Sequence, residues 1–124
     1  LTRKVRFNAG NYSFLHSRKT IPIEFGYETY GQLNEAKDNA VLICHYFTGT
    51  SHAAGRYDDS DPAPGWWDSL IGSGKAIDTD KYFVICSDCI SNINFNSPTV
   101  ITTGPASINP ETGRPYGMTF PIFT

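Results

Sequence analysis

Residues 40–44 (Ala-Val-Leu-Ile-Cys) and residues 82–86 (Tyr-Phe-Val-Ile-Cys) are the two stretches that decide the fold. A short run of consecutive apolar residues is typical of a strand that is covered on both faces, as in a parallel sheet. The connection between the two runs is too long for a hairpin and suits a crossover. We therefore predict two neighbouring parallel strands, each buried on both faces.

An antiparallel ribbon is predicted upstream of these strands. Every odd position from 21 to 27 is apolar or aromatic, and the positions between are polar, glycine or proline, which is the period of a strand with one wet face. Pro22 lacks an N–H and therefore favours an edge or a strand start. Tyr12 and Phe14 alternate in the same way, so the two segments can pair across residues 16–19.

The remainder of the chain supplies little to cover such a sheet. Residues 65–72 (Gly-Trp-Trp-Asp-Ser-Leu-Ile-Gly) are predicted to form a short helix with glycine at both ends. Residues 88–124 show no sustained period and contain many turn formers. A parallel sheet needs helices on both faces. We therefore predict an α/β fold in which residues 1–124 are the N-terminal part of one domain, incomplete on its own: a mostly parallel sheet with an antiparallel edge ribbon.

The composition excludes several classes of partner. A formal net charge of -2 without a basic stripe argues against nucleic acid. No apolar run approaches the roughly 18 residues of a membrane span, and the N-terminus lacks the layout of a signal peptide. The three cysteines are an odd number, and Cys44 and Cys86 lie in apolar runs, which indicates buried free thiols and a reducing, cytoplasmic compartment. The single C-x-x-C pair, Cys86 and Cys89, lacks the four ligands that zinc needs, so no metal is expected.

The loop after the first apolar strand, residues 44–49 (Cys-His-Tyr-Phe-Thr-Gly), is the best candidate for a site. Ligands of α/β sheets bind at the carboxyl ends of strands, and a glycine lets the backbone turn tightly beside a substrate. A backbone N–H in such a loop can stabilise the oxyanion of a tetrahedral acyl intermediate. Ser51 lies in a near match to a nucleophile elbow over residues 49–53. It is rejected because several loop residues separate it from the strand and no helical pattern follows.

Long blocks of this sequence resemble homoserine O-acetyltransferases in order and in spacing. They cover most of the chain from residue 27 onward: residues 27–34, 44–49, 52–55, 65–68, 72–87, 103–110 and 112–117. The resemblance implies an α/β-hydrolase fold with a Ser, Asp and His triad. In that chemistry, acetyl passes from acetyl-CoA to the serine and then to the homoserine hydroxyl. The resemblance also implies a homodimer in methionine biosynthesis, with acetyl-CoA as cosubstrate and no bound cofactor.

The same resemblance assigns one catalytic group to this chain. The N–H of Phe47 shares the oxyanion with the N–H that follows the nucleophile, and three neighbours support the loop: His45, Thr48 and Gly49. The nucleophile, acid and base of the family lie beyond residue 124. A weaker set is predicted on the substrate side: His52, Trp66, Trp67, Thr103 and Gly104.

Several alternatives stay open at this level. His45 and His52 fit hydrogen-bonded structural roles better than the role of a base, and adjacent tryptophans commonly serve packing. Tyr46 and Phe47 are bulkier than the alanine and leucine usual in the family, and residues 90–102 replace a glycine-rich stretch, so the acyl acceptor is open. The acyl-serine can instead pass to water, as in an esterase or deacylase. The chain can also be a non-catalytic part that completes a fold with the missing portion.

Overall fold

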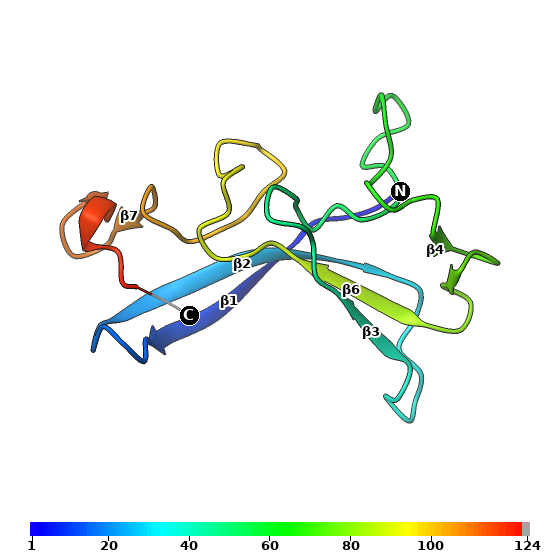
Figure 1. Ribbon diagram of the computed structural model, residues 1–124, viewed down its shortest axis with the longest axis horizontal. Helices are drawn as coiled ribbons and strands as arrows, with labels where there is room; N and C mark the ends of the chain where they lie inside the picture. Colours follow the sequence, from blue (N-terminus) through cyan, green and yellow to red (C-terminus); the bar gives the residue numbers. More distant parts are fainter. Residues whose placement is uncertain (123–124) are drawn as a thin grey trace.

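A four-stranded mixed sheet organises the computed structural model, which describes residues 1–122. Its order is β1-β2-β6-β3, formed by Val5–Ser13, Thr20–Tyr30, Phe83–Ser87 and Ala40–Ile43 (Figure 1). β1 and β6 each pair antiparallel with β2, and β3 pairs in parallel with β6. The predicted ribbon and the predicted parallel pair are confirmed. The sheet of residues 1–122 is mixed rather than mostly parallel, and residues 123 and 124 lie outside the described part.

The ribbon follows the alternation of its side chains. Ile21 and Ile23 of β2 are buried, and Pro22 lies between them opposite Asn11, on the part of β2 that β6 does not reach. Proline is tolerated there because, among the strands of residues 1–122, only β1 pairs with β2 at residue 22, so the side of β2 away from β1 loses no ladder hydrogen bond. The register shifts between Asn8 and Gly10, where Gly10 has a φ of 70°. This irregularity bends β1 along the twisted ribbon.

The connections carry only very short elements. They are β4 (Ile71–Gly72) paired in parallel with β5 (Ile77–Asp78), β7 (Ile108–Asn109) paired antiparallel with β8 (Arg114–Pro115), and the 3-10 turn η1 (Gly117–Thr119). No α-helix occurs in residues 1–122, so the predicted helix over residues 65–72 is wrong. Turn hydrogen bonds replace it, for example from the Asp68 N–H to the Gly65 carbonyl. So short a segment gains too few bonds to offset the cost of helix nucleation.

Two clusters of buried side chains hold the connections against the sheet. One covers the β3 and β6 pair: Ile43, Ala53, Ala54, Ile71, Val84 and Cys86. The other covers the part of the ribbon beyond β6: Phe14, Ile21, Ile23 and Tyr116. Figure 1 shows the long connections that follow β3 and β6 above the sheet. Irregular chain therefore takes the place that a covering helix was expected to fill.

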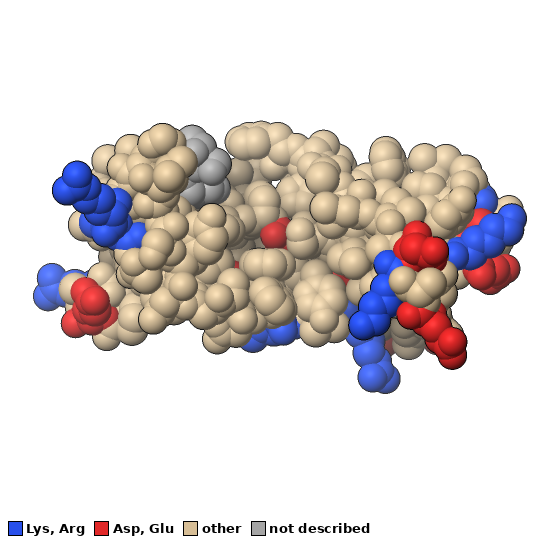
Figure 2. All heavy atoms as spheres, turned by 90° about the horizontal axis from the view of Figure 1, so that it is seen from below, with Lys and Arg blue, Asp and Glu red and all other residues tan. Residues whose placement is uncertain are grey.

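The opposite face of the β3 and β6 pair is uncovered in the described chain. The register places Leu42 beside Ile85 and Thr29 on that face, and Leu42 is 66% exposed. The predicted burial of residues 40–44 on both faces is therefore wrong for this chain, because only one layer packs on the sheet. In the view from below (Figure 2), charged side chains gather toward the two ends of the molecule and are sparse between them.

The cysteines divide into one buried thiol and two exposed ones. Cys44 lies just beyond β3 and is exposed, contrary to its predicted burial, and Cys89 is exposed as well. Cys86 is buried in β6, and this burial raises the pKa of its thiol to about 12.

Across residues 1–122, no helix has the length and apolar character that a membrane crossing requires.

Candidate active site

The loop that leaves β3 is a tight turn with Phe47 and Thr48 at its corners. The Gly49 N–H donates to the Tyr46 carbonyl at 2.7 Å, which closes a four-residue β-turn. A Cβ at Gly49 would stand 3.1 Å from that carbonyl oxygen, so the close turn favours glycine. Phe47 is 83% exposed, and within residues 1–122 its N–H donates no hydrogen bond. A free N–H at the carboxyl end of a parallel strand is what an oxyanion donor requires.

His45 controls the direction of the Phe47 N–H. Its Nδ1 lies 2.7 Å from the Tyr46 carbonyl oxygen, and its Nε2 accepts from the Cys89 N–H at 3.2 Å. Because Nε2 accepts, Nδ1 carries the proton and donates. The peptide between Tyr46 and Phe47 is planar and trans, so its C=O and its N–H point in opposite directions. Anchoring the carbonyl therefore orients the N–H, and both ring nitrogens of His45 are engaged in structure.

Two asparagines from the connection after β6 also hold this turn, and the sequence reasoning missed them. Asn92 Nδ2 donates to the Gly49 carbonyl at 3.0 Å, and Asn94 Nδ2 donates to the Thr48 carbonyl at 2.9 Å. Asn92 is 1% exposed. These bonds join residues 43 and 46 positions apart in the chain. Neither local period nor motif spacing signals contacts at such a separation.

Trp66 contacts the turn through its ring and holds the next residue through its indole N–H, and Trp67 packs against Trp66. Trp66 Nε1 donates to the Thr50 carbonyl at 3.0 Å, and its ring packs edge-on against Tyr46 with the centroids 5.4 Å apart. It also packs against the core cluster over β3 and β6. The Trp67 ring lies 5.0 Å from that of Trp66 and is partly exposed. These contacts favour the packing role for Trp66, because its one polar atom is already satisfied within the chain.

His52 belongs to a buried cluster around Glu28, a residue whose importance the sequence did not reveal. Its Nδ1 lies 3.1 Å from Glu28 Oε2, and its ring stacks on Tyr57 at 4.2 Å. Glu28 is 0% exposed, accepts from the hydroxyls of Tyr30 and Tyr57, and pairs with Lys4 Nζ at 3.2 Å. Burial and the charge of Glu28 raise the pKa of both phenols well above the ordinary value. Both tyrosines therefore stay neutral donors.

Ser51 is part of the same cluster. It is 0% exposed, its hydroxyl is held by Lys4 Nζ, and its N–H donates to Asp88 Oδ1 at 2.8 Å. Asp88 also accepts the Ile101 N–H at 3.1 Å and pairs with Lys4 at 3.1 Å. A hydroxyl that is fully buried and already bonded to an ammonium group is closed to an acyl donor. Ser51 therefore serves to tie the loop after β3 to the end of β6.

Thr103 and Gly104 make no hydrogen bond to the turn within residues 1–122. The Thr103 hydroxyl donates to the Glu24 carbonyl and accepts from the Glu24 N–H, both at 2.9 Å, so it pins the last connection to β2. Gly104 packs against Ser91, because a Cβ at 104 would stand 2.9 Å from the Ser91 Cα. Gly104 also borders a cavity of about 370 Å³, whose walls include Asn92, Ile93, Phe95, Pro105 and Ala106.

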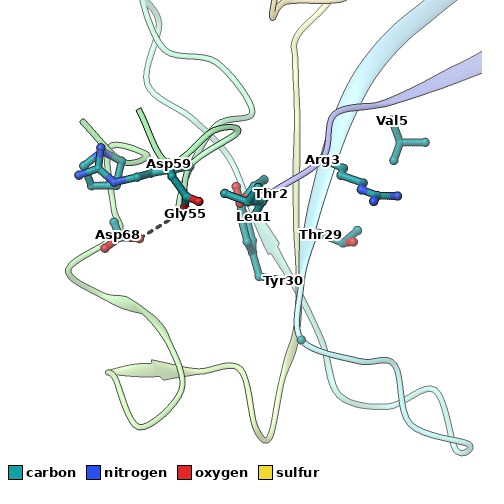
Figure 3. A pocket seen from close by; sticks show the side chains of 12 residues that line it. Leu1, Thr2, Arg3, Val5, Thr29, Tyr30, Gly55, Asp59 and Asp68 are labelled. Carbon is teal, nitrogen blue, oxygen red and sulfur yellow. Dashed lines mark hydrogen bonds between the residues drawn. The ribbon is translucent and has the colours of Figure 1, made fainter. Parts of the chain in front are cut away.

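A larger hollow lies elsewhere, beside the N-terminus. It has a volume of about 830 Å³ and is lined by residues that include Leu1, Arg3, Tyr30, Gly55 and Asp68 (Figure 3). The Gly55 N–H donates to Asp68 Oδ1 at 2.8 Å along its wall. None of the predicted site residues lines it, so size alone does not mark the site. Residues 1–122 contain no group of three metal-ligating side chains that could hold an ion.

Several known proteins are similar to this chain in sequence and in fold. No family model matches it. A homoserine O-acetyltransferase of Deferribacter desulfuricans is 56% identical over 123 residues, which are 99% of this chain and 31% of that protein. The crystal structure of homoserine O-acetyltransferase from Bacillus anthracis matches with a TM-score of 0.96 at 56% identity, covering 100% of this chain and 33% of that chain. The crystal structure of esterase E22 matches with a TM-score of 0.95 at 54% identity, covering 100% of this chain and 34% of that one.

The mixed sheet, with a glycine turn at the carboxyl end of its parallel strand, is part of an α/β-hydrolase-type architecture. The class can be narrowed further. The chain belongs to the homoserine O-acetyltransferase family, and it spans between a fifth and a third of the length of the relatives that it matches.

Proposed function

We propose that this chain supplies the oxyanion loop of an acyl-CoA-dependent O-acyltransferase. The reaction moves acetyl from acetyl-CoA to the homoserine hydroxyl in methionine biosynthesis, and relatives of that name at 56% identity support it. The enzyme is a cytoplasmic homodimer that uses acetyl-CoA as cosubstrate and has no resident cofactor. The nucleophile, acid and base come from residues outside this chain, so residues 1–124 alone are inactive.

The chemistry has two steps with the same electrostatic demand. In the first, a serine hydroxyl attacks the thioester carbonyl and the CoA thiolate leaves. In the second, the homoserine hydroxyl attacks the acyl-serine and the serine leaves. In each step the carbonyl oxygen becomes an oxyanion, and the Phe47 N–H donates to it together with the N–H after the nucleophile.

One observation carries the proposal: the Phe47 N–H is oriented, and it donates no hydrogen bond within residues 1–122. The Tyr46 carbonyl of the same peptide is held by Gly49 and His45, which directs the N–H away from the loop. A donor that is already oriented needs little reorganisation when charge develops, and this is why such donors accelerate acyl transfer.

An esterase or deacylase is the second candidate, and one comparison favours it. Esterase E22 shares the fold of this chain at 54% identity and a TM-score of 0.95. An esterase passes the acyl-serine to water instead of to an amino-acid hydroxyl. Thiol release from acetyl-CoA by the full-length protein separates the two functions. Release that depends on homoserine supports the transferase, and release or ester hydrolysis that proceeds without it supports the esterase.

A non-catalytic role remains for the chain by itself, as a part that docks onto the rest of a fold. The uncovered face of β3 and β6, with Leu42 66% exposed, supports this reading. Homoserine-dependent thiol release by residues 1–124 alone would contradict both this role and the placement of the nucleophile outside the chain.

Phe47→Pro tests the oxyanion donor directly. Proline has no N–H, and the second position of a β-turn is one that proline favours, so the variant deletes the donor and keeps the turn. Loss of one oxyanion donor costs roughly 10²- to 10³-fold in kcat, or about 3 kcal/mol. We expect a loss of that size in the full-length protein, whether the acceptor is homoserine or water.

Phe47→Ala is the matched control because it keeps the N–H. Phe47 is 83% exposed in the described chain, so removal of its ring costs little packing. We expect Phe47→Ala to change kcat less than tenfold. A Phe47→Pro variant that folds and has the same kcat as Phe47→Ala would remove the proposed role of this N–H.

A further inference from the structure

The turn after β3 is held from outside by the chain that follows β6. Three carbonyls of the turn have partners supplied by side chains: that of Tyr46 from His45, that of Thr48 from Asn94 and that of Gly49 from Asn92. The Cys89 N–H in turn holds the His45 ring. The segment from residue 89 to residue 94 therefore holds the turn in place by hydrogen bonds.

The bond from Asn94 leads to the Phe47 N–H through two peptide groups. Asn94 Nδ2 donates to the Thr48 carbonyl at 2.9 Å. The N–H of that same peptide belongs to Gly49, and it donates to the Tyr46 carbonyl at 2.7 Å. The N–H of the Tyr46 peptide is that of Phe47. Each peptide is planar, so a fixed carbonyl fixes the opposite N–H, and hydrogen bonds in series polarise one another.

Asn92 fixes the conformation of this segment, residues 89–94. Its Oδ1 accepts the Asn94 N–H at 2.9 Å, and its Nδ2 donates to the Gly49 carbonyl at 3.0 Å. Its own N–H donates to the hydroxyl of Thr102 at 3.2 Å. With 1% exposure, Asn92 has no water to replace these bonds. One side chain thus fixes both Asn94 and the end of the turn.

We propose that Asn94 and Asn92 are positioning residues for the acyl-transfer reaction, which aim the Phe47 N–H at the oxyanion without touching the substrate. This inference rests on the proposed function. It assigns a purpose to the asparagine-rich stretch that sets residues 90–102 apart from the glycine-rich segment usual in the family. The asparagine side chains donate hydrogen bonds to the carbonyls of the turn, and glycine has no side chain that could do so.

Asn94→Asp in the full-length protein is the primary test. The change is nearly isosteric and removes the Nδ2 donor, and Asn94 is only half-buried, so the fold should survive it. Asn96→Asp is the matched control, because Asn96 is exposed in the same segment and has the same change of charge. A shift of about 1 Å in a catalytic group costs roughly 10²-fold. We expect kcat to fall about 10- to 100-fold in Asn94→Asp with KM within threefold, and to change less than twofold in Asn96→Asp.

A double-variant cycle with Phe47→Pro separates positioning from general structural damage. If Asn94 acts through the Phe47 N–H, then Asn94→Asp has almost no further effect once that N–H is gone, so the combined loss equals that of Phe47→Pro alone. A merely structural role predicts losses that multiply. Asn92→Asp, confirmed as folded by circular dichroism, should follow the same pattern.

The outcomes keep the two proposals apart. If Phe47→Pro is as active as Phe47→Ala, the proposed function of the turn is wrong. If Phe47→Pro is impaired but Asn94→Asp equals Asn96→Asp, or its loss multiplies with that of Phe47→Pro, the turn works as proposed and the positioning role is overturned.

Discussion

Lys4→Met should destabilise this protein far more than any exposed charge change. Lys4 is 10% exposed and stands 3.2 Å from Glu28 and 3.1 Å from Asp88, two carboxylates whose side chains are 0% exposed. Methionine fills similar space without the charge. It leaves both carboxylates buried without a cation from residue 4, which is the costly situation for buried ions.

The magnitude follows from this geometry. At an effective dielectric constant near 20, unit charges 3.2 Å apart attract by about 5 kcal/mol, and desolvation offsets part of this. Breaking one partner of a buried pair costs about 3–5 kcal/mol. We expect Lys4→Met to lower the free energy of unfolding by that amount.

Arg6→Met is the matched control, since Arg6 lies on β1 close to Lys4 and pairs with Glu24. Those side chains are 57% and 42% exposed, so solvent screens the pair and its loss costs less than about 1 kcal/mol. Urea unfolding of the full-length protein, followed by circular dichroism, measures both variants. Adding Glu28→Gln to Lys4→Met should recover part of the loss, because it neutralises a stranded carboxylate. Equal losses for Lys4→Met and Arg6→Met would refute the reasoning.

Three further outcomes are expected. His45→Phe should lower kcat roughly five- to tenfold, since it removes a hydrogen bond of about 1 kcal/mol to the Tyr46 carbonyl, and His45→Asn should restore part of the activity by keeping a donor there; equal kcat in the two variants would argue against that bond. Cys86 should resist iodoacetamide at pH 8 in the folded protein, because burial raises its thiol pKa to about 12 and the thiolate is the nucleophile; a labelled Cys86 peptide before denaturation, found by mass spectrometry, would show the burial to be wrong. The Gly55 N–H and Lys75 hold the pKa of Asp68 below its ordinary value of 3.8, so its stabilising contribution is present above pH 3.8 and is lost as pH falls through the lower, folded value; the gap in thermal midpoint between wild type and Asp68→Asn should therefore shrink on acidification, and a constant gap would contradict this.

The strands could be read from the sequence because their signals are local. The alternation from residue 21 to residue 27 and the apolar runs at 40–44 and 82–86 each depend on neighbouring side chains. They led to the ribbon and the parallel pair that the structure shows. The prediction of a helix over residues 65–72 was wrong although it also used local signals, the glycines at its two ends. The conformation of so short a segment depends on the residues that it packs against, which local signals do not give.

The candidate site shows the same division. A glycine turn after a parallel strand, and the family blocks around it, pointed to Phe47 and to the support from His45 on the basis of residues close together in the chain. Asn92 and Asn94 could not be found in that way, because they reach the turn across more than forty residues. The sequence by itself determined the strands, the turn and the family. Only the tertiary structure decided which side chains hold the carbonyls of the turn around Phe47 and where two carboxylates share Lys4, because hydrogen bonds and buried charges depend on distances that folding alone sets.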